Sequence, residues 1–205
     1  MKPLAAPFSS PPTPAAPPTD AEVARAVLAG HVELFRLLVE RHQRRVFNLA
    51  YRMTGNRSDA EDIAQDVFVK LYEHLARYDA AQPLENWLMR IASNYTLNWL
   101  EKNARRTQRT TTLDSDDERQ SPLPTPDPSP SAPATLERRE VGMRLLAALQ
   151  TLPVNQRLVV VLRYLDDLSV EEIAALLGAP KNTVKTWLAR GRDALRIRLG
   201  DLTLE

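Results

Sequence analysis

Several features that often reveal a protein's chemistry are missing from this sequence. It contains no cysteine among its 205 residues, which excludes disulfides and metal sites built on thiolates. Its histidines, His31, His42 and His74, are scattered and show no spacing typical of metal ligands. We therefore expect no metal site and no cofactor, and a chain suited to a reducing compartment such as the cytoplasm.

Long hydrophobic runs and strand patterns are also missing. No stretch approaches the roughly 20 consecutive apolar residues that a membrane-spanning helix needs, so we expect no membrane insertion. The N-terminus does not resemble a signal peptide, because prolines interrupt it and no apolar segment follows Lys2. The β-prone run LVVVL at 158–162 is short and is flanked by helix signals. The sequence therefore predicts an all-α protein.

Proline is concentrated in two places, and these divide the chain. Residues 1–19 hold seven of the sixteen prolines, and residues 111–135 hold six prolines and five acids. Such segments are too polar and too rich in proline to pack, so we expect a disordered tail and a flexible linker. We then expect two small helical domains over residues 20–110 and 136–199, and a C-terminal tail over 200–205.

Residues 169–195 form the most informative stretch, because they predict two short helices joined by a tight turn. Ser169 can cap the first helix, and Glu172 can complete a capping box. Gly178 follows where that helix must stop, since glycine tolerates the left-handed conformation of a C-terminal cap. Pro180 suits the first turn of the next helix, where its missing N–H would be unbonded anyway.

The spacing within this stretch is typical of a helix-turn-helix motif. Ala174, Gly178 and Val184 would let the two helices cross closely, and in such a motif the second helix enters the major groove of DNA. Residues 181–198 hold six basic residues and one acid, which suits contacts with phosphates and base edges. A helical hairpin with a solvated basic face is the alternative, but spacing, caps and charge together favour DNA binding. The candidate DNA-binding residues are Lys181, Asn182, Thr183, Lys185, Thr186, Arg190 and Arg192.

Both units are expected to be helical throughout. In the first unit, hydrophobic periodicity and turn residues predict a helix over 20–29 capped by Asp20, helices over 31–53 and 58–75, a loop over 77–86 and a helix that begins at Asn86. Ser58 and Glu61 are expected to form a capping box. In the second unit we expect a helix from about Leu136 to 151 and another from 154 to Leu165, ahead of the helix-turn-helix.

The helix over 58–75 carries an acidic cluster near its start. Residues 59–66 contain Asp59, Glu61, Asp62 and Asp66 and no basic residue. Acids near a helix N-terminus complement the helix dipole, which explains the first three but not Asp66, two turns into the helix. A face that binds a partner protein is the other interpretation, and charge alone supports the two equally.

The helix from Asn86 mixes aromatic, amide and basic side chains. Residues 86–110 hold five basic residues against Glu101 alone, and the rings among them could stack on the bases of a strand-separated nucleic acid. Trp87 lies at helical spacing from Ile91, so a place in the core is favoured for its ring. Trp99 is less clearly a core residue.

Three strings, taken in order, resemble the bacterial extracytoplasmic-function (ECF) sigma factors, of the RpoE-like group that keeps only sigma regions two and four. The strings are DAEDIAQDVFVKLY, NWLMRIASN and LPVNQRLVVVLRYLDDLSVEEIAALLGAPKNTVKTWLARGRDAL. The resemblance implies a subunit that directs core RNA polymerase to promoters and is not an enzyme. The sequence likewise offers no nucleophile–base pair and no glycine loop to cradle a phosphate.

The resemblance also implies which residues contact each partner. The clamp helices of the largest catalytic polymerase subunit would be gripped by Asp59, Glu61, Asp62, Gln65, Asp66 and Lys70. The minus-ten promoter element would be opened, and a flipped base held, by Tyr78, Asn86, Arg90, Asn94, Asn98, Lys102, Arg105 and Arg106. The helix-turn-helix would read the double-stranded minus-thirty-five element, and its domain would meet the flap of the second-largest subunit. The linker would thread near the polymerase active centre, and an anti-sigma factor is a further expected partner.

Three positions depart from the family pattern. Asn98 and Glu101 stand where Asp and Arg are common, which would weaken duplex contact there or change the preferred promoter. Trp187 takes a recognition-helix position that arginine usually holds. Because tryptophan buries a large area, packing against its own domain is favoured over contact with a thymine methyl.

Two other functions remain open from the residues alone. A free-standing transcriptional regulator could bind an operator through the same helix-turn-helix, although the first unit would then have no role. The second function left open is that of an enzyme with a small-molecule site between the first helices. Transcription from a promoter template with core polymerase alone would separate both from a sigma factor.

Overall fold

The structure, a computed structural model, describes the backbone of residues 17–110 and 132–200 and the side chains of 17–106 and 140–200. Every regular element within these ranges is helical, which confirms the predicted all-α class. The expected tail over 1–19, linker over 111–135 and C-terminal tail over 200–205 fall mostly on residues 1–16, 111–131 and 201–205, which lie outside the described residues.

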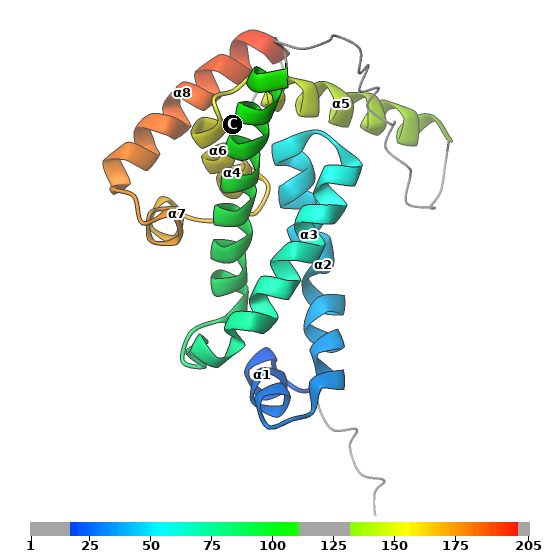
Figure 1. The fold of residues 1–205 in the computed structure, drawn as a ribbon. Helices are drawn as coiled ribbons and strands as arrows, with labels where there is room; N and C mark the ends of the chain where they lie inside the picture. The colour runs from blue at the N-terminus through cyan, green and yellow to red at the C-terminus, as the bar shows by residue number, and fades with distance from the viewer. Residues whose placement is uncertain (1–16, 111–131, 201–205) are drawn as a thin grey trace, which may run out of the picture.

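The first unit is a bundle of three long helices with a short helix across its end. In chain order its elements are α1 (Asp20–Leu28), η1 (Val32–Leu34), α2 (Phe35–Thr54), α3 (Arg57–His74), η2 (Leu75–Arg77) and α4 (Leu84–Thr110). Helices α2, α3 and α4 pack on one another, and α1 crosses the foot of the bundle (Figure 1). The bundle thereby leaves one face of α3 and one face of α4 on its outside.

The cap of α1 differs from the expected one. Thr19, and not Asp20, is the N-cap: its hydroxyl accepts from the Glu22 N–H, and the Glu22 carboxylate accepts from the Thr19 N–H at 2.7 Å. This is a capping box one residue earlier than predicted. Asp20 instead binds across to α2, where Arg41 and His42 each lie 2.7 Å from its carboxylate. Those bonds hold its pKa below the usual value, although burial alone would raise that pKa.

The start of α3 also lies earlier than predicted. Gly55 ends α2 in a left-handed conformation with φ of 72°, so the next residue, Asn56, is already extended and becomes the N-cap. Its side chain accepts from the Asp59 N–H at 3.2 Å. The capping box expected of Ser58 and Glu61 is therefore absent, because Ser58 already lies inside the helix.

Helix α4 begins at Leu84 rather than at Asn86. Pro83 stands directly before the first helical residue, where its missing N–H costs nothing, and its carbonyl accepts from the Asn86 N–H at 3.2 Å. Leu84 is buried, so the extra residues extend the apolar contact of α4 with the bundle.

The second unit consists of α5 (Ala132–Gln150), α6 (Val154–Tyr164), α7 (Val170–Leu177) and α8 (Lys181–Leu199). The start of α5 lies within the segment predicted as linker, where Pro133 fits the first turn of a helix. The predicted helix-turn-helix is confirmed as α7 and α8. Ser169 and Glu172 form the expected capping box, and Gly178 ends α7 with φ of 62°.

Helices α7 and α8 pack together with Ala174 and Val184 buried, but Gly178 does not supply the close approach expected of it. A Cβ added to Gly178 would meet nothing within 4 Å, so this glycine serves its positive φ and not a close approach. At Gly191 of α8, in contrast, a Cβ would lie 2.8 Å from Val160 Cγ2 of α6. The absence of a side chain at Gly191 therefore lets α8 lie close to α6.

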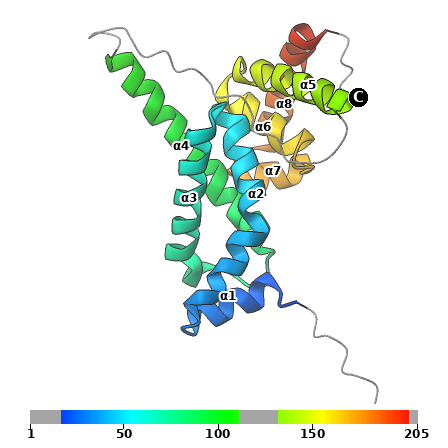
Figure 2. The same cartoon turned by 90° about the vertical axis from the view of Figure 1, so that its right-hand side faces the viewer.

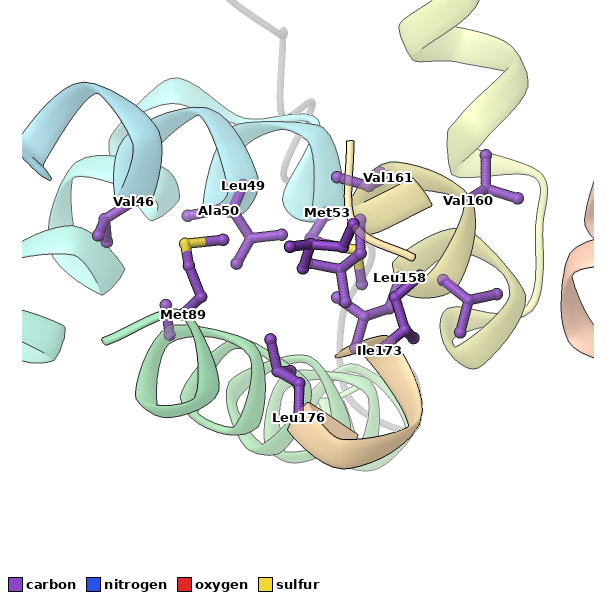
Figure 3. Packing of buried hydrophobic residues seen from close by; sticks show 14 of the residues in the cluster. Val46, Leu49, Ala50, Met53, Met89, Leu158, Val160, Val161, Ile173 and Leu176 are labelled. Carbon is purple, nitrogen blue, oxygen red and sulfur yellow. The ribbon is translucent and has the colours of Figure 1, made fainter. Parts of the chain in front are cut away.

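The two units share one hydrophobic core. Met53 of α2, Met89 of α4, Leu158 of α6 and Ile173 of α7 all belong to the same buried cluster (Figure 3). Helix α7 packs on α4, while α5 and α6 pack on α2. The sequence predicted two separate units, and in this structure they lie against each other, with α5 to α8 gathered on one side of α2 (Figure 2).

Candidate nucleic-acid interface and partner-binding face

The outer face of α8 presents most of the predicted DNA-binding residues to solvent. Thr183 is half-buried, and the other six are exposed, namely Lys181, Asn182, Lys185, Thr186, Arg190 and Arg192. The opposite face of α8 is fixed to the domain by Val184 and Leu195, which are fully buried. The helix therefore offers a polar, cationic surface on a rigid support, as contact with a DNA groove requires.

Two of these side chains already have partners within the protein. The Lys181 amine lies 3.1 Å from the Glu171 carboxylate of α7, and the Thr186 hydroxyl donates to the Asn182 carbonyl at 2.8 Å. The Lys181 contact lowers the pKa of Glu171. Lys185, Arg190 and Arg192 make no hydrogen bond or ion pair within the described ranges, so their cations are available for DNA.

Trp187 packs against the domain, as the sequence favoured. It is half-buried and lies against the shared hydrophobic core. Its ring therefore supports the position of α8 rather than extending from its outer face.

One stripe along α4 contains nearly all the residues predicted to contact the minus-ten element. Asn86, Arg90, Asn94, Asn98 and Lys102 follow at intervals of four residues, so each lies next to the one before it along a ridge that winds slowly round the helix. All five are exposed, as are Arg105 and Arg106 at the end of the helix. On the inner side, Leu88 and Met89 are buried. Because α4 is held by its apolar face, these exposed side chains form an amide-rich and basic surface that can bind a polyanion.

Tyr78, the remaining residue of that set, lies in the turn ahead of α4. Its ring stacks on Trp87 with 5.6 Å between the ring centroids, and its hydroxyl donates to the Gln82 carbonyl at 2.6 Å. Partial burial, together with Asp20 and Asp79, raises the pKa of Tyr78. Trp87 is half-buried and packs on the core, as expected, and Trp99 does the same.

A pocket of about 340 Å³ opens beside this stacked pair. Tyr78, Asn86, Trp87 and Arg90 line it from the first unit. Aromatic rings beside amide and guanidinium donors can stack on a base and hydrogen-bond its edge. The second unit supplies the opposite wall, which the sequence did not predict.

The acidic cluster lies on the outer face of α3. Glu61, Asp62, Gln65 and Asp66 are exposed, and Asp59 is half-buried near the N-terminus of the helix. Ile63, Val67 and Leu71 are fully buried on the opposite side. Asp62 and Gln65 make no hydrogen bond or ion pair with the described part of the chain. The helix therefore leaves an acidic face open to a partner.

Contacts within the protein account for some of these residues. Glu61 pairs with Arg57 at 2.8 Å, one turn away on the same helix. The carboxylate of Asp66 accepts a short hydrogen bond from the Tyr95 hydroxyl of α4. Partial burial and this bond raise the pKa of Tyr95 to about 12. The Lys70 amine lies over the same ring, 5.6 Å from its centroid. Asp66, which the helix dipole did not explain, therefore ties α3 to α4.

Two residues of the outer face were missed in the sequence. Val69 is 55% exposed and Tyr72 is 44% exposed, although the Tyr72 ring also packs edge-on against Phe35 of α2 with 5.2 Å between the ring centroids. Both lie on the side of α3 that also carries Asp62 and Gln65, because spacings of three and four residues connect all four positions. Their positions out of phase with Ile63 and Val67 could have revealed them.

Within residues 17–110 and 132–200, no cluster of histidines or acids has the geometry of a metal site. No helix in the same ranges is long and apolar enough to cross a membrane.

Comparison with known proteins identifies the class. The model of sigma-70 region 2 matches residues 38–106, and that of sigma-70 region 4 matches residues 142–195. The ECF RNA polymerase sigma factor SigW of Bacillus subtilis is 34% identical over 87% of this chain and 95% of its own length. The ECF RNA polymerase sigma-E factor of Escherichia coli K12 is 32% identical over 86% of this chain and 92% of its own length.

A solved structure has the same fold. It is the sigma factor RpoE of Bartonella quintana, in complex with the anti-sigma factor NepR. The two chains are 21% identical with a TM-score of 0.64, and the match covers 82% of this chain and 98% of the other.

An all-helical chain with a region 2 bundle and a region 4 helix-turn-helix is a sigma factor. This protein belongs to the family of ECF RNA polymerase sigma factors. It is therefore a non-enzymatic initiation factor that binds core RNA polymerase and promoter DNA. The match to sigma-70 region 2 gives the first unit a role. In a free-standing regulator that binds an operator, that unit would have none.

Proposed function

We propose that this chain is an RpoE-like sigma factor that acts in the cytoplasm, with a different outer surface for each of three contacts. The 32% identity with the sigma-E factor of Escherichia coli supports the group. The observation that supports three separate contacts is that the exposed faces of α3, α4 and α8 differ in charge and composition. The functional domains would span 20–110 and 136–199.

The outer face of α3 would bind the clamp helices of the largest polymerase subunit. Asp62 and Gln65 supply unpaired polar groups, and Val69 and Tyr72 supply exposed apolar area. Such a mixture suits a protein interface, where apolar contact gives affinity and charge gives orientation. The edge of this interface would be formed by Asp59, Glu61, Asp66 and Lys70. Of these, Asp66 and Lys70 also hold α3 to α4.

The stripe on α4 and the pocket beside it would take the melted minus-ten strand. Arg90 and Lys102 can neutralise phosphates, and Asn94 can hydrogen-bond a base edge. Tyr78 and Trp87 would border the pocket that receives a flipped base. Asn86, Asn98, Arg105 and Arg106 extend this surface along the helix.

The outer face of α8 would read the minus-thirty-five duplex in its major groove. The main contacts with the duplex would be made by Lys185, Thr186 and Arg190. These side chains are exposed on the outer face of α8, and the other side of the helix is buried. Lys181, Asn182, Thr183 and Arg192 would bind phosphates and fix the register. The flap of the second-largest subunit would bind elsewhere on the same domain.

An anti-sigma factor is a further expected partner. The solved relative of this fold was crystallised with one. Its binding to this chain would cover the faces of α3 and α8 and hold them from polymerase and DNA.

Reconstituted transcription tests the proposal. Core polymerase is mixed with the purified chain and genomic DNA of the source organism, and transcript starts are mapped by sequencing. We expect starts that share one minus-ten and one minus-thirty-five sequence and that vanish without the chain. Starts without a shared upstream sequence, or none above core polymerase alone, would contradict the proposal.

A further inference from the structure

A tyrosine of α4 contacts two oppositely charged residues of α3. Asp66 and Lys70 are four residues apart on that helix, and an acid and a base at this spacing commonly form an ion pair. Here neither of them forms an ion pair with the described part of the chain. Each contacts Tyr95 of α4 instead, the acid through the hydroxyl and the base through the ring. Tyr95 therefore takes up both charges separately.

The hydroxyl of Tyr95 fixes the direction of the Asp66 carboxylate. It donates to Oδ2 of Asp66, and a bond from a hydroxyl to an ionised carboxylate is stronger than one between neutral groups. Partial burial and this bond raise the pKa of Tyr95 to about 12, so the hydroxyl keeps its proton at neutral pH and remains a donor. A carboxylate has two acceptor oxygens. The other oxygen of Asp66 is thus held in place and still open to a partner.

The ring of Tyr95 supports the Lys70 amine. The amine lies 5.6 Å from the ring centroid, within the range of a cation–π contact, which extends to about 6 Å. The ring is neutral, so the ammonium keeps its full charge for a partner. An ion pair between Lys70 and Asp66 would instead neutralise both side chains and turn them towards each other.

The position of the ring is set by the packing of α3 on α4. Tyr95 is half-buried, and Ala92 and Thr96 beside it on α4 are buried, as are Ile63 and Val67 of α3. The two helices pack directly on each other (Figure 1). The ring is therefore held by the apolar contact between the helices, and it offers a fixed support for two side chains that are otherwise free to rotate.

We propose that Tyr95 is a positioning residue for core polymerase, which keeps Asp66 and Lys70 apart and directs both charges outwards. The inference rests on the proposed role of α3 as the polymerase-binding face. The matching surface of polymerase would present a basic group to Asp66 and an acidic group to Lys70. Without the Tyr95 hydroxyl, the Asp66 carboxylate would turn to Lys70, and polymerase would have to break that ion pair and order both side chains.

The variant Tyr95→Phe tests this inference because it removes the hydroxyl and keeps the ring. Affinity for core polymerase is measured by fluorescence anisotropy of the full chain, with a dye on its N-terminal amine. We expect the affinity to fall about three- to tenfold, which is the usual effect of having to order one or two additional side chains. An affinity equal to that of the parent would overturn the inference.

Tyr51→Phe is the matched control. Tyr51 is half-buried on α2 of the same bundle and stacks on Phe47, and its hydroxyl makes no hydrogen bond with the described part of the chain. Its loss should leave the affinity for core polymerase unchanged. If Tyr51→Phe lowers the affinity as much as Tyr95→Phe does, the loss is a general effect of removing a hydroxyl from the bundle, and the inference is overturned.

Double-mutant cycles distinguish a positioning role from a purely structural one. In the Asp66→Ala background, Tyr95→Phe should cause no further loss of affinity, because the carboxylate that it directs is gone. In the Lys70→Ala background the loss should be smaller than in the parent, because the freed carboxylate has no neighbouring cation to pair with. A loss as large as the parent's in either background would overturn the inference.

The same measurements separate the inference from the proposed function. If Asp66→Ala keeps the parent's affinity while Asp62→Arg lowers it, α3 remains the polymerase-binding face and only the inference is overturned. If neither change lowers the affinity, the proposed role of α3 is contradicted as well.

Discussion

Replacing Gly191 by alanine tests how the DNA-reading helix is held in place. The new Cβ would lie 2.8 Å from Val160 Cγ2 and 3.4 Å from the Gln156 carbonyl oxygen, both on α6. The first distance is well inside normal van der Waals contact, and a β-branched side chain such as valine has little rotamer freedom with which to move aside. Helix α8 or α6 must therefore shift.

The cost follows from two opposing effects. Overpacking a well-packed core costs about 1–3 kcal/mol. Alanine in place of glycine inside a helix returns about 0.8–1.0 kcal/mol. We expect a net loss of about 1 kcal/mol in the free energy of unfolding, because the clash slightly outweighs the gain in propensity. For a chain of this size that corresponds to a fall in Tm of about 2–4 °C.

Thermal and urea unfolding of a double-mutant cycle measure this effect. The second site is Val160→Ala, which removes the methyl group that clashes. In that background Gly191→Ala should cost less or become stabilising, with a coupling of about 0.5–3 kcal/mol. If Gly191→Ala alone stabilises the parent by the full gain in helix propensity, then α8 and α6 leave room for the new Cβ beside Val160.

Further expected outcomes concern each proposed contact. Asp62→Arg should weaken core polymerase affinity tenfold or more, whereas the same change at exposed Glu33 should not; equal effects would remove α3 from the interface. Arg190→Ala should lose about 1–3 kcal/mol of promoter discrimination if it reads a base, or only lower the salt dependence if it touches a phosphate. The raised pKa of Tyr95 means that its contribution to the free energy of unfolding is present below pH 10 and is lost as the pH rises towards about 12. Tyr95→Phe should abolish that part of the loss of stability at alkaline pH. An unchanged pH profile would count against the bond to Asp66.

Helix caps and the composition of a helix face depend on residues that are close together in the sequence. The caps at Ser169 and Gly178 were predicted correctly because both depend on residues within one helical turn. The caps of α1 and α3 were wrong by one and two residues, since Thr19 and Asn56 compete with adjacent polar residues that are equally good caps. The basic and amide residues of α8 and α4 were recognised from local composition, and their expected roles came from the resemblance to sigma factors.

Other features depend on which helices meet. No pattern around Asp66 indicates that its partner is Tyr95 on another helix, and nothing near Gly191 indicates that α6 passes there. The exposed Val69 and Tyr72 were missed because the partner-binding face of α3 was predicted from its charged residues and not from its apolar ones. Burial in such cases is a property of the neighbouring helices and not of the segment that carries the residue.

The sequence by itself determined the helical class, the helix-turn-helix, the charge of each outer face and the family, because each of these depends on spacing within a segment. Only the tertiary structure decided that the two units share a core, that Arg157 caps α2 and that α7 forms a wall of the pocket beside Tyr78 and Trp87. Arg157 and Met53 lie 104 residues apart. A bond between such residues is selected by the free energy of packing the whole chain, which no local pattern records.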